Sequence, residues 1–208
     1  MQSRGYLLAV LLITVVTLGI GVVLWNSGGQ QLPIDKECKG WCRGAEDPLV
    51  IIDTFPDFGC SLCVNKERMI VQILDIYPDE VRVDYHHYPY NSFSYTLAEA
   101  LECAGEQDMF WEMHDRLYLG EMPGNMSELL SAAESIGLNM SMFNGSLNSG
   151  KFRDKVLDEK EQSIADGAQA ASLYINKALY MGSSNSLEYF SSVINAVIGE
   201  ARAAGGAQ

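Results

Sequence analysis

Cys60 and Cys63, separated by two residues, are the side chains whose types and spacing point most directly to chemistry. A hydrophobic segment, residues 49–55, precedes them, and an amphipathic helical pattern, residues 64–74, follows them. A Cys-x-x-Cys pair between a strand and a helix is typical of a site that exchanges a dithiol for a disulfide. The first cysteine then lies at the helix N-terminus, where unpaired N–H groups and the helix dipole favour a thiolate. The second is close enough to close a disulfide across the first turn.

A second pair, Cys38 and Cys42, lies upstream with three residues between its members. Paired cysteines outside the cytoplasm tend to form disulfides, and this pair would close a small loop. We expect a second disulfide that acts as a local staple. A second redox pair that exchanges electrons with Cys60 and Cys63 is the alternative, and the stretch contains no histidine to favour a metal site.

The other reactive side chains are better explained by packing. Cys103 begins no Cys-x-x-Cys motif, so we expect it to pack as a small apolar residue. His86 and His87 follow a predicted strand, whose successive side chains point to opposite faces, and this disfavours a shared metal ion. His114 lies in an aromatic-rich helical segment and is expected to be structural. We therefore predict no metal site and no cofactor.

The elements that position the cysteines follow from the hydrophobic pattern. Residues 49–55 predict a strand buried on both faces, and the alternating residues 81–85 predict a second strand. The helix between them implies a right-handed crossover and a parallel pair. Helical segments follow at residues 95–104, 108–119, 127–136, 141–147 and 151–166, then strands at 170–176 and 178–181, and a helix at 187–201. This order predicts an α/β, thioredoxin-like fold with an inserted all-helical subdomain.

Two details of the helices are also predicted. In the helix after the motif, the apolar stripe should face inward, with the charged residues mostly outside. The inward residues are Leu62, Met69, Ile70, Ile73 and Leu74, and the outward ones are Lys66, Glu67 and Arg68. Ser127 is the candidate N-cap of the third inserted helix.

The N-terminus predicts a membrane anchor. Residues 6–25 form an uncharged run of 20 residues, the length of a helix that spans a bilayer. Arg4 precedes this run, so the positive-inside rule places the N-terminus in the cytoplasm and the remainder outside. We expect a single-pass protein of the cell membrane with an extracytoplasmic domain. A cleaved signal peptide is the alternative.

These patterns divide the chain into four parts. Residues 1–27 are the predicted transmembrane anchor, and residues 28–47 are a juxtamembrane linker with Cys38 and Cys42. Residues 48–92 and 168–208 form the thioredoxin-like domain, and residues 93–167 form the helical insertion. The chain has 14 basic and 27 acidic residues, a formal net charge of −13. Such a surface repels phosphates, so nucleic acid is not an expected partner.

Two motifs resemble the DsbA-type thiol–disulfide oxidoreductases, in the branch with a membrane anchor. Residues 51–63 (IIDTFPDFGCSLC) are similar to the family's strand and its F-x-D-F-x-C-x-x-C motif. Residues 103–115 (CAGEQDMFWEMHD) are similar to its helix pair. The resemblance, over about residues 47–201, implies that Cys60 is the nucleophile and Cys63 the resolving cysteine. It also implies protein thiols and disulfides as substrates, with a membrane-embedded redox partner.

The sequence departs from this family at one place. The family has a Thr-Pro or Val-Pro pair, with the proline cis, just before a strand that resembles residues 172–176. Here Ala170 and Ala171 occupy that place, and the resemblance makes them the candidate substrate-binding residues. A cis bond without proline costs about 2.5–4 kcal/mol, so we expect a trans peptide. The alternative function is a non-catalytic binding protein whose Cys-x-x-Cys is structural or binds a metal.

Overall fold

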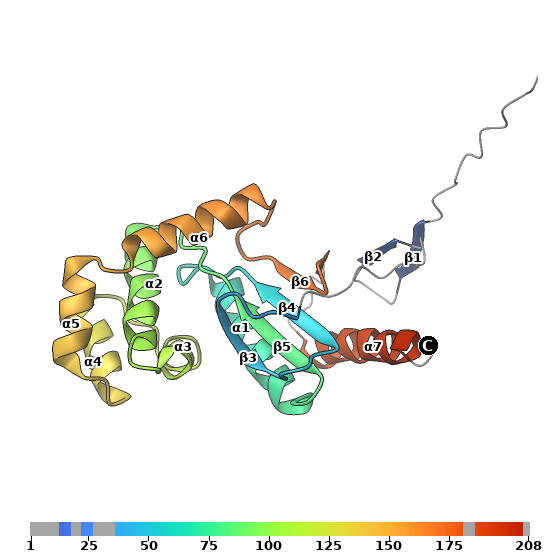
Figure 1. The fold of residues 1–208 in the computed structure, drawn as a ribbon, viewed down its shortest axis with the longest axis horizontal. Coiled ribbons are helices and arrows are strands. Elements are labelled where there is room, and N and C mark those ends of the chain that lie inside the picture. The colour runs from blue at the N-terminus through green and yellow to red at the C-terminus, as the bar shows by residue number, and fades with distance from the viewer. Residues whose placement is uncertain (1–12, 18–21, 27–35, 181–185, 206–208) are drawn as a thin grey trace, which may run out of the picture.

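The computed structural model describes residues 13–17, 22–26, 36–180 and 186–205 (Figure 1). Within the stretch expected to be a transmembrane helix, β1 (Ile13–Thr17) and β2 (Val22–Asn26) are strands paired antiparallel, so a transmembrane helix is not confirmed there. Both are rich in β-branched side chains, which favour an extended chain. The rest of the stretch lies outside the described residues. Within the ranges given, no helix is both long and apolar enough to cross a membrane.

A five-stranded sheet forms the centre of the described structure (Figure 1). Its strand order is β3-β5-β4-β6-β7, with β4 and β5 parallel and the other neighbours antiparallel. The strands are β3 (Trp41–Gly44), β4 (Val50–Thr54), β5 (Val81–Tyr85), β6 (Leu173–Ile175) and β7 (Ala178–Leu179). Every residue of β4 is buried, as predicted for the central strand.

The edge strand β3 corrects the expected division of the chain. Residues 28–47 were expected to be a linker, but Trp41–Gly44 pairs with β5 and extends the sheet. The Trp41 ring stacks on Phe110 with centroids 4.1 Å apart, and its Nε1 donates to Glu102 Oε1 at 2.8 Å. These long-range contacts with the helical insertion hold β3 in the fold, and no local pattern of four residues could reveal them.

Two helices cover one face of the sheet. α1 (Ser61–Ile76) contacts β5 and α7 (Leu187–Gly205), and α7 contacts β4. The inward residues of α1 are buried as predicted, except for Leu62, which is 42% exposed. Glu67 is only 1% exposed, against the expectation that it faces outward. Its carboxylate has hydrogen-bond partners on two other elements, which are described below.

The insertion is entirely helical, as predicted. It comprises α2 (Ser92–Gly105), α3 (Phe110–Tyr118), α4 (Met126–Ser135), α5 (Met140–Ser149) and α6 (Arg153–Ala165). α2 to α5 lie beside the sheet, and α6 runs back toward it (Figure 1). The expected cap of α4 was wrong by two residues, because Asn125 accepts from Glu128 N at 3.0 Å and is the N-cap.

Candidate active site

Cys60 occupies the N-cap of α1, where the carboxyl end of the central strand leads into the helix. Its backbone is extended, with φ −108° and ψ 108°, and its sulfur accepts from Cys63 N at 3.2 Å. Cys60 is partly exposed, whereas Cys63 is buried in the first turn, and both thiols are free. The structure therefore describes the reduced dithiol, with one sulfur open to solvent and the other behind it.

Asp57 shapes the turn before Cys60, a role that the sequence motif did not reveal. Its carboxylate accepts from Gly59 N at 3.1 Å and from Tyr90 N at 3.0 Å, and its carbonyl accepts from Cys60 N at 3.1 Å. A Cβ on Gly59 would lie 2.9 Å from Asn91 Nδ2, so only glycine fits here without a shift. Asp57 thus joins the motif to the loop after β5.

Cys63 is held as a thiol. Burial raises its pKa to about 12, and the Cys60 sulfur and the Asp57 carboxylate contribute to this rise. A hydrogen bond from the Asp57 backbone acts in the opposite direction and lowers the pKa. The thiol is the poorer nucleophile, so Cys63 does not compete for external disulfides at neutral pH. Cys60 is therefore the sulfur open to solvent, and Cys63 is the internal one.

The loop at Ala171 differs in conformation from a loop that carries proline. Ala171 has φ +61°, in the left-handed region, and its N–H donates to Phe55 O at 2.9 Å. Its carbonyl accepts from Lys66 Nζ at 2.7 Å, so the loop is tied to α1 one turn beyond the cysteines. Burial lowers the pKa of Lys66, while Cys63 and Cys60 oppose this change. No peptide bond of the described residues is cis.

A buried network under α1 contains Glu67, whose role the sequence pattern missed. Glu67 Oε1 accepts from Thr54 Oγ1 at 2.5 Å, and Glu67 Oε2 lies 3.3 Å from His114 Nε2. His114 Nδ1 lies 3.0 Å from Asp115 Oδ1, and Asp115 pairs with Arg43 at 2.7 Å. The chain of contacts joins β4, α1, α3 and β3. Only the sequence FWEMHD, with adjacent histidine and aspartate, hinted at it.

His114 is charged more readily than an ordinary histidine. Burial by itself lowers its pKa, but the hydrogen bonds to Asp115 and Glu67 outweigh burial and raise it. For Asp115, burial acts to raise the pKa, and its contacts with His114 and Arg43 lower it overall. The expectation that His114 is structural agrees with these contacts.

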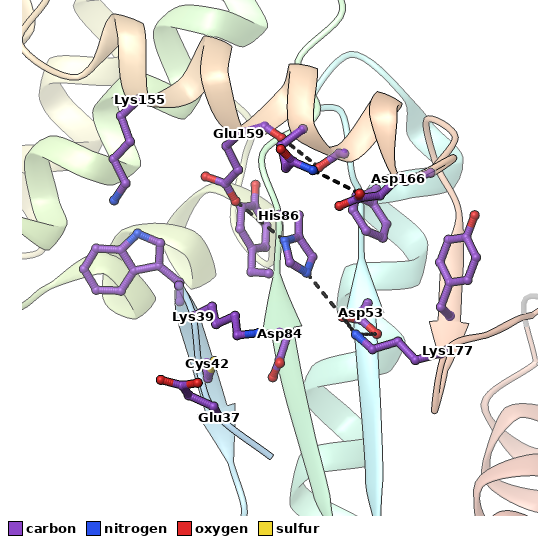
Figure 2. Close-up of a pocket in the computed structure, with 18 residues that line it drawn as sticks. Glu37, Lys39, Cys42, Asp53, Asp84, His86, Lys155, Glu159, Asp166 and Lys177 are labelled. Carbon is purple, nitrogen blue, oxygen red and sulfur yellow. Dashed lines mark hydrogen bonds and ion pairs between the residues drawn. The ribbon is translucent and has the colours of Figure 1, made fainter. Parts of the chain in front are cut away.

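Cys38 and Cys42 form a disulfide with a Cα–Cα distance of 6.0 Å. Cys42 lines a cavity of about 680 Å³ between the sheet and α6, whereas neither Cys60 nor Cys63 is among the residues that line it (Figure 2). The Cys38–Cys42 disulfide is thus separate from the Cys60–Cys63 dithiol and lies on another face of the molecule. Trp111 Nε1 donates to Cys42 O at 3.2 Å and ties this segment to α3.

The remaining candidates lie away from the dithiol. Cys103 is 1% exposed in the core of the insertion, and burial raises its pKa to about 12. His86 Nε2 lies 3.3 Å from Asp53 Oδ1, and His86 stacks on Phe55 with centroids 4.6 Å apart. His87 is fully buried beside Glu102. The rings of the two histidines hydrogen-bond to different carboxylates, whereas Glu159 Oε1 lies near both residues, 3.8 Å from His86 Nδ1 and 3.2 Å from His87 N.

A partly exposed cysteine at a helix N-terminus, with a buried cysteine behind it and a mixed sheet beside it, defines a thioredoxin-fold dithiol protein. Residues 36–196, which include both cysteines, match the family model described as thioredoxin. The chain belongs to this thioredoxin family.

Curated relatives are larger proteins. The chain is 26% identical over 163 residues to Na(+)/H(+) antiporter NhaA 1 of Salinispora arenicola, a match to 74% of this chain and 24% of the antiporter. It is 26% identical over 138 residues to the antiporter NhaA of Herminiimonas arsenicoxydans, which covers 66% and 22% of the two chains. The chain thus spans about a quarter of the length of the curated relatives it matches.

Solved structures of DsbA-type proteins share the fold. Alpha-DsbA1 of Wolbachia pipientis has a TM-score of 0.67 at 20% identity, covering 83% of this chain and 94% of that chain. BdbD of Bacillus subtilis has a TM-score of 0.65 at 18% identity, covering 80% and 95%. A thioredoxin-like oxidoreductase from Silicibacter pomeroyi has a TM-score of 0.67 at 19% identity, covering 81% and 95%. These likenesses extend through the helical insertion.

Proposed function

We propose that this protein is a thiol–disulfide oxidoreductase of the DsbA type that acts on protein dithiols and disulfides. The observation that carries the proposal is the asymmetry of the dithiol. Cys60 is accessible at the helix N-terminus, whereas Cys63 is buried with its pKa raised to about 12. One exposed and one internal sulfur is the arrangement that a two-step exchange requires.

In the oxidative direction, a substrate thiolate attacks the Cys60 sulfur of the Cys60–Cys63 disulfide. The bond between the cysteines breaks, Cys63 leaves as a thiolate and takes a proton, and a mixed disulfide forms on Cys60. A second substrate thiolate then attacks the substrate sulfur of that mixed disulfide and releases Cys60. The substrate loses two electrons and gains a disulfide, and the enzyme is left as the reduced dithiol. Reduction runs through the same steps in reverse.

Ala170 and Ala171 are proposed to contact the substrate chain beside Cys60. Hydrogen bonds tie the loop to Lys66 of α1 and to Phe55, the residue that follows β4. Ala170 is exposed. Ala171 is less accessible to a partner, because its backbone is hydrogen-bonded to Phe55 and Lys66. A loop held in this way offers a different backbone surface from one built on proline, so substrate preference should differ as well.

Dithiol exchange by the purified protein tests the proposed activity. We expect Cys60→Ser to lower the rate of disulfide transfer to a reduced model protein by at least about a hundredfold, because the attacked sulfur is gone. Cys63→Ser, incubated with a disulfide-bonded protein, should accumulate a mixed disulfide on Cys60, because no second cysteine is present to resolve it. Cys103→Ser, which removes a buried thiol outside the site, is the matched control and should retain the wild-type rate. Equal slow rates for the wild type and Cys60→Ser would instead support a non-catalytic binding protein.

We further propose that the protein is anchored in the cell membrane, with its N-terminus in the cytoplasm and the dithiol outside. The 20-residue uncharged run at residues 6–25, preceded by Arg4, supports this location. The similarity to parts of membrane antiporters is consistent with a location at a membrane. A membrane-embedded redox partner would then regenerate the site.

Fractionation tests the anchor. The full chain should sediment with membranes, resist an alkaline wash and need detergent for release, because an apolar segment inserted in the bilayer is not removed by salt or pH. A variant that begins at residue 36 should stay soluble in the same experiment. A shortened, soluble product of the full chain would indicate a cleaved signal peptide and would contradict the anchor.

A further inference from the structure

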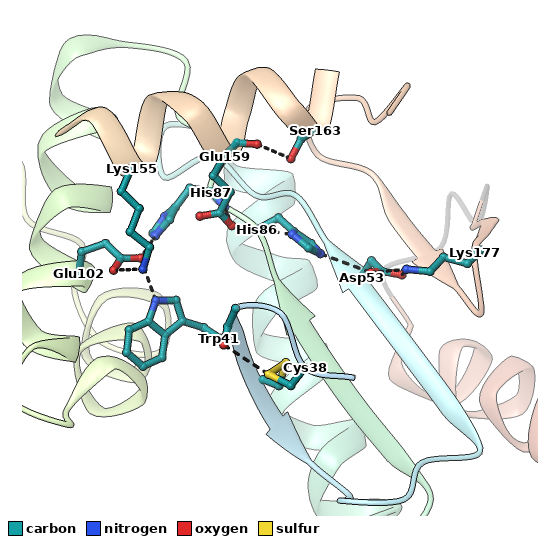
Figure 3. Close-up of polar contacts among 12 residues, drawn as sticks. Cys38, Trp41, Asp53, His86, His87, Glu102, Lys155, Glu159, Ser163 and Lys177 are labelled. Carbon is teal, nitrogen blue, oxygen red and sulfur yellow. Dashed lines mark hydrogen bonds and ion pairs between the residues drawn. A yellow bond between two sulfur atoms is a disulfide. The ribbon is translucent and has the colours of Figure 1, made fainter. Parts of the chain in front are cut away.

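A histidine and two carboxylates converge on the side of the molecule where the insertion meets the sheet (Figure 3). His87 follows β5, Glu102 lies on α2, and Glu159 lies on α6. One nitrogen of His87 and one oxygen of each carboxylate lie within 4.8 Å of one another. His87 is 0% exposed and Glu102 is 2% exposed, so this is an interior cluster rather than a solvated acidic surface.

The hydrogen bonds of this cluster leave one buried atom unpaired. His87 Nε2 lies 2.9 Å from Glu102 Oε1, and His87 N donates to Glu159 Oε1 at 3.2 Å. His87 Nδ1 has no hydrogen-bond partner although it is fully buried. An unpaired buried polar atom costs stability and calls for an explanation. A neutral ring keeps one lone pair for a ligand, and with the ring proton on Nδ1 the Nε2 atom, 2.9 Å from Glu102 Oε1, is close enough for both atoms to contact one ion.

We propose that His87, Glu102 and Glu159 bind a divalent cation, with Zn²⁺ as the best match. Imidazole nitrogen combined with carboxylate oxygen suits zinc, whereas Mg²⁺ and Ca²⁺ prefer sites made of oxygen alone. Glu159 lines the cavity of about 680 Å³, so an ion can reach the cluster from that side. The ion would join the end of β5 to two helices of the insertion.

Lys155 is the internal competitor for this site. Its Nζ lies 2.5 Å from Glu102 Oε2 and 5.4 Å from the centroid of the Trp41 ring. The ammonium group supplies the positive charge that the carboxylate needs, and an ion at Glu102 must displace it. The Lys155 side chain is 50% exposed, so it can swing into solvent. Its removal should therefore tighten metal binding, an effect opposite to that of removing a ligand.

Isothermal titration with Zn²⁺ alone tests the site. The full-length protein is used in its oxidised form, so that Cys60 and Cys63 are joined and cannot bind the metal. We expect one Zn²⁺ per chain, with Glu159→Gln weakening the Kd at least about tenfold and Lys155→Ala tightening it. Glu161→Gln, an exposed carboxylate on the same helix, is the matched control and should leave the Kd unchanged.

Three results would overturn the proposal. The first is the absence of Zn²⁺ binding by the wild type. The second is equal affinity for the wild type and Glu159→Gln, because the metal would then lie elsewhere. The third is an affinity for Mg²⁺ equal to that for Zn²⁺, because an imidazole ligand would not give that result. Glu159 is partly exposed, so its conservative variant should fold, and the shape of the circular dichroism spectrum confirms this for each variant.

Discussion

Glu67→Leu should lower the free energy of unfolding by about 3–5 kcal/mol, the usual cost of removing one partner of a buried ion pair. Glu67 is 1% exposed and pairs with His114, which is fully buried and has its pKa raised. The leucine leaves the imidazolium without one of its two carboxylates and Thr54 Oγ1 without its acceptor. Urea unfolding of the purified protein, followed by circular dichroism, measures the change.

Two control variants separate this effect from a general effect of the helix. Glu67→Gln keeps the shape and an acceptor for Thr54, so its loss should be smaller. Asp75→Leu makes the same change of type at an exposed position of α1, and should alter stability by no more than about 0.5 kcal/mol. Comparable losses at Glu67 and Asp75 would contradict the buried network.

The same variant should show a pH dependence of definite sign. A histidine whose folded pKa is raised above 6.5 contributes stability that is fully present below that value and lost as the pH rises through the folded pKa. The stability difference between the wild type and Glu67→Leu should therefore narrow as the pH rises above 6.5 and passes through the raised folded pKa of His114. A difference that grows over this range would mean that His114 is not the charged partner.

Ala171→Pro should destabilise the protein by about 3 kcal/mol, although proline is the residue that the resemblance to the DsbA type implies at this place. Proline fixes φ near −65°, whereas Ala171 has φ +61°, and proline has no N–H to donate to Phe55 O. Ala171→Gly should have the opposite sign, with a gain of up to about 1 kcal/mol, because glycine tolerates positive φ. The midpoints of thermal unfolding for both variants test this.

The two substitutions of Ala171 are expected to change the stability in opposite directions, and each result tests the conformation of the loop. If Ala171→Pro were as stable as the wild type, the loop would have adopted another conformation, and the bond between Lys66 and the carbonyl of residue 171 would be the first to change. If Ala171→Gly were strongly destabilising, the left-handed conformation at this position would be wrong. Both results bear on the loop alone and leave the chemistry of the cysteines untouched.

The sequence by itself determined the dithiol and the elements that flank it. The spacing of Cys60 and Cys63, the apolar run before them and the helical period after them are local properties, and local properties specify a strand, a helix start and their order. Glycines and polar residues between the helical segments likewise placed the insertion. Family membership then followed from two contiguous motifs.

Only the tertiary structure decided which polar residues are buried together. Glu67 looked like an exposed helix residue, and Trp41–Gly44 like a linker, because a helical period or four residues carry no information about a distant partner. His114 meets Glu67 where α3 contacts α1, and Asp115 of the same helix meets Arg43 of β3. The cluster at His87 arises in the same way, from three elements far apart in the chain. Burial of a charged group is stable only with a partner in place, and the fold supplies that partner.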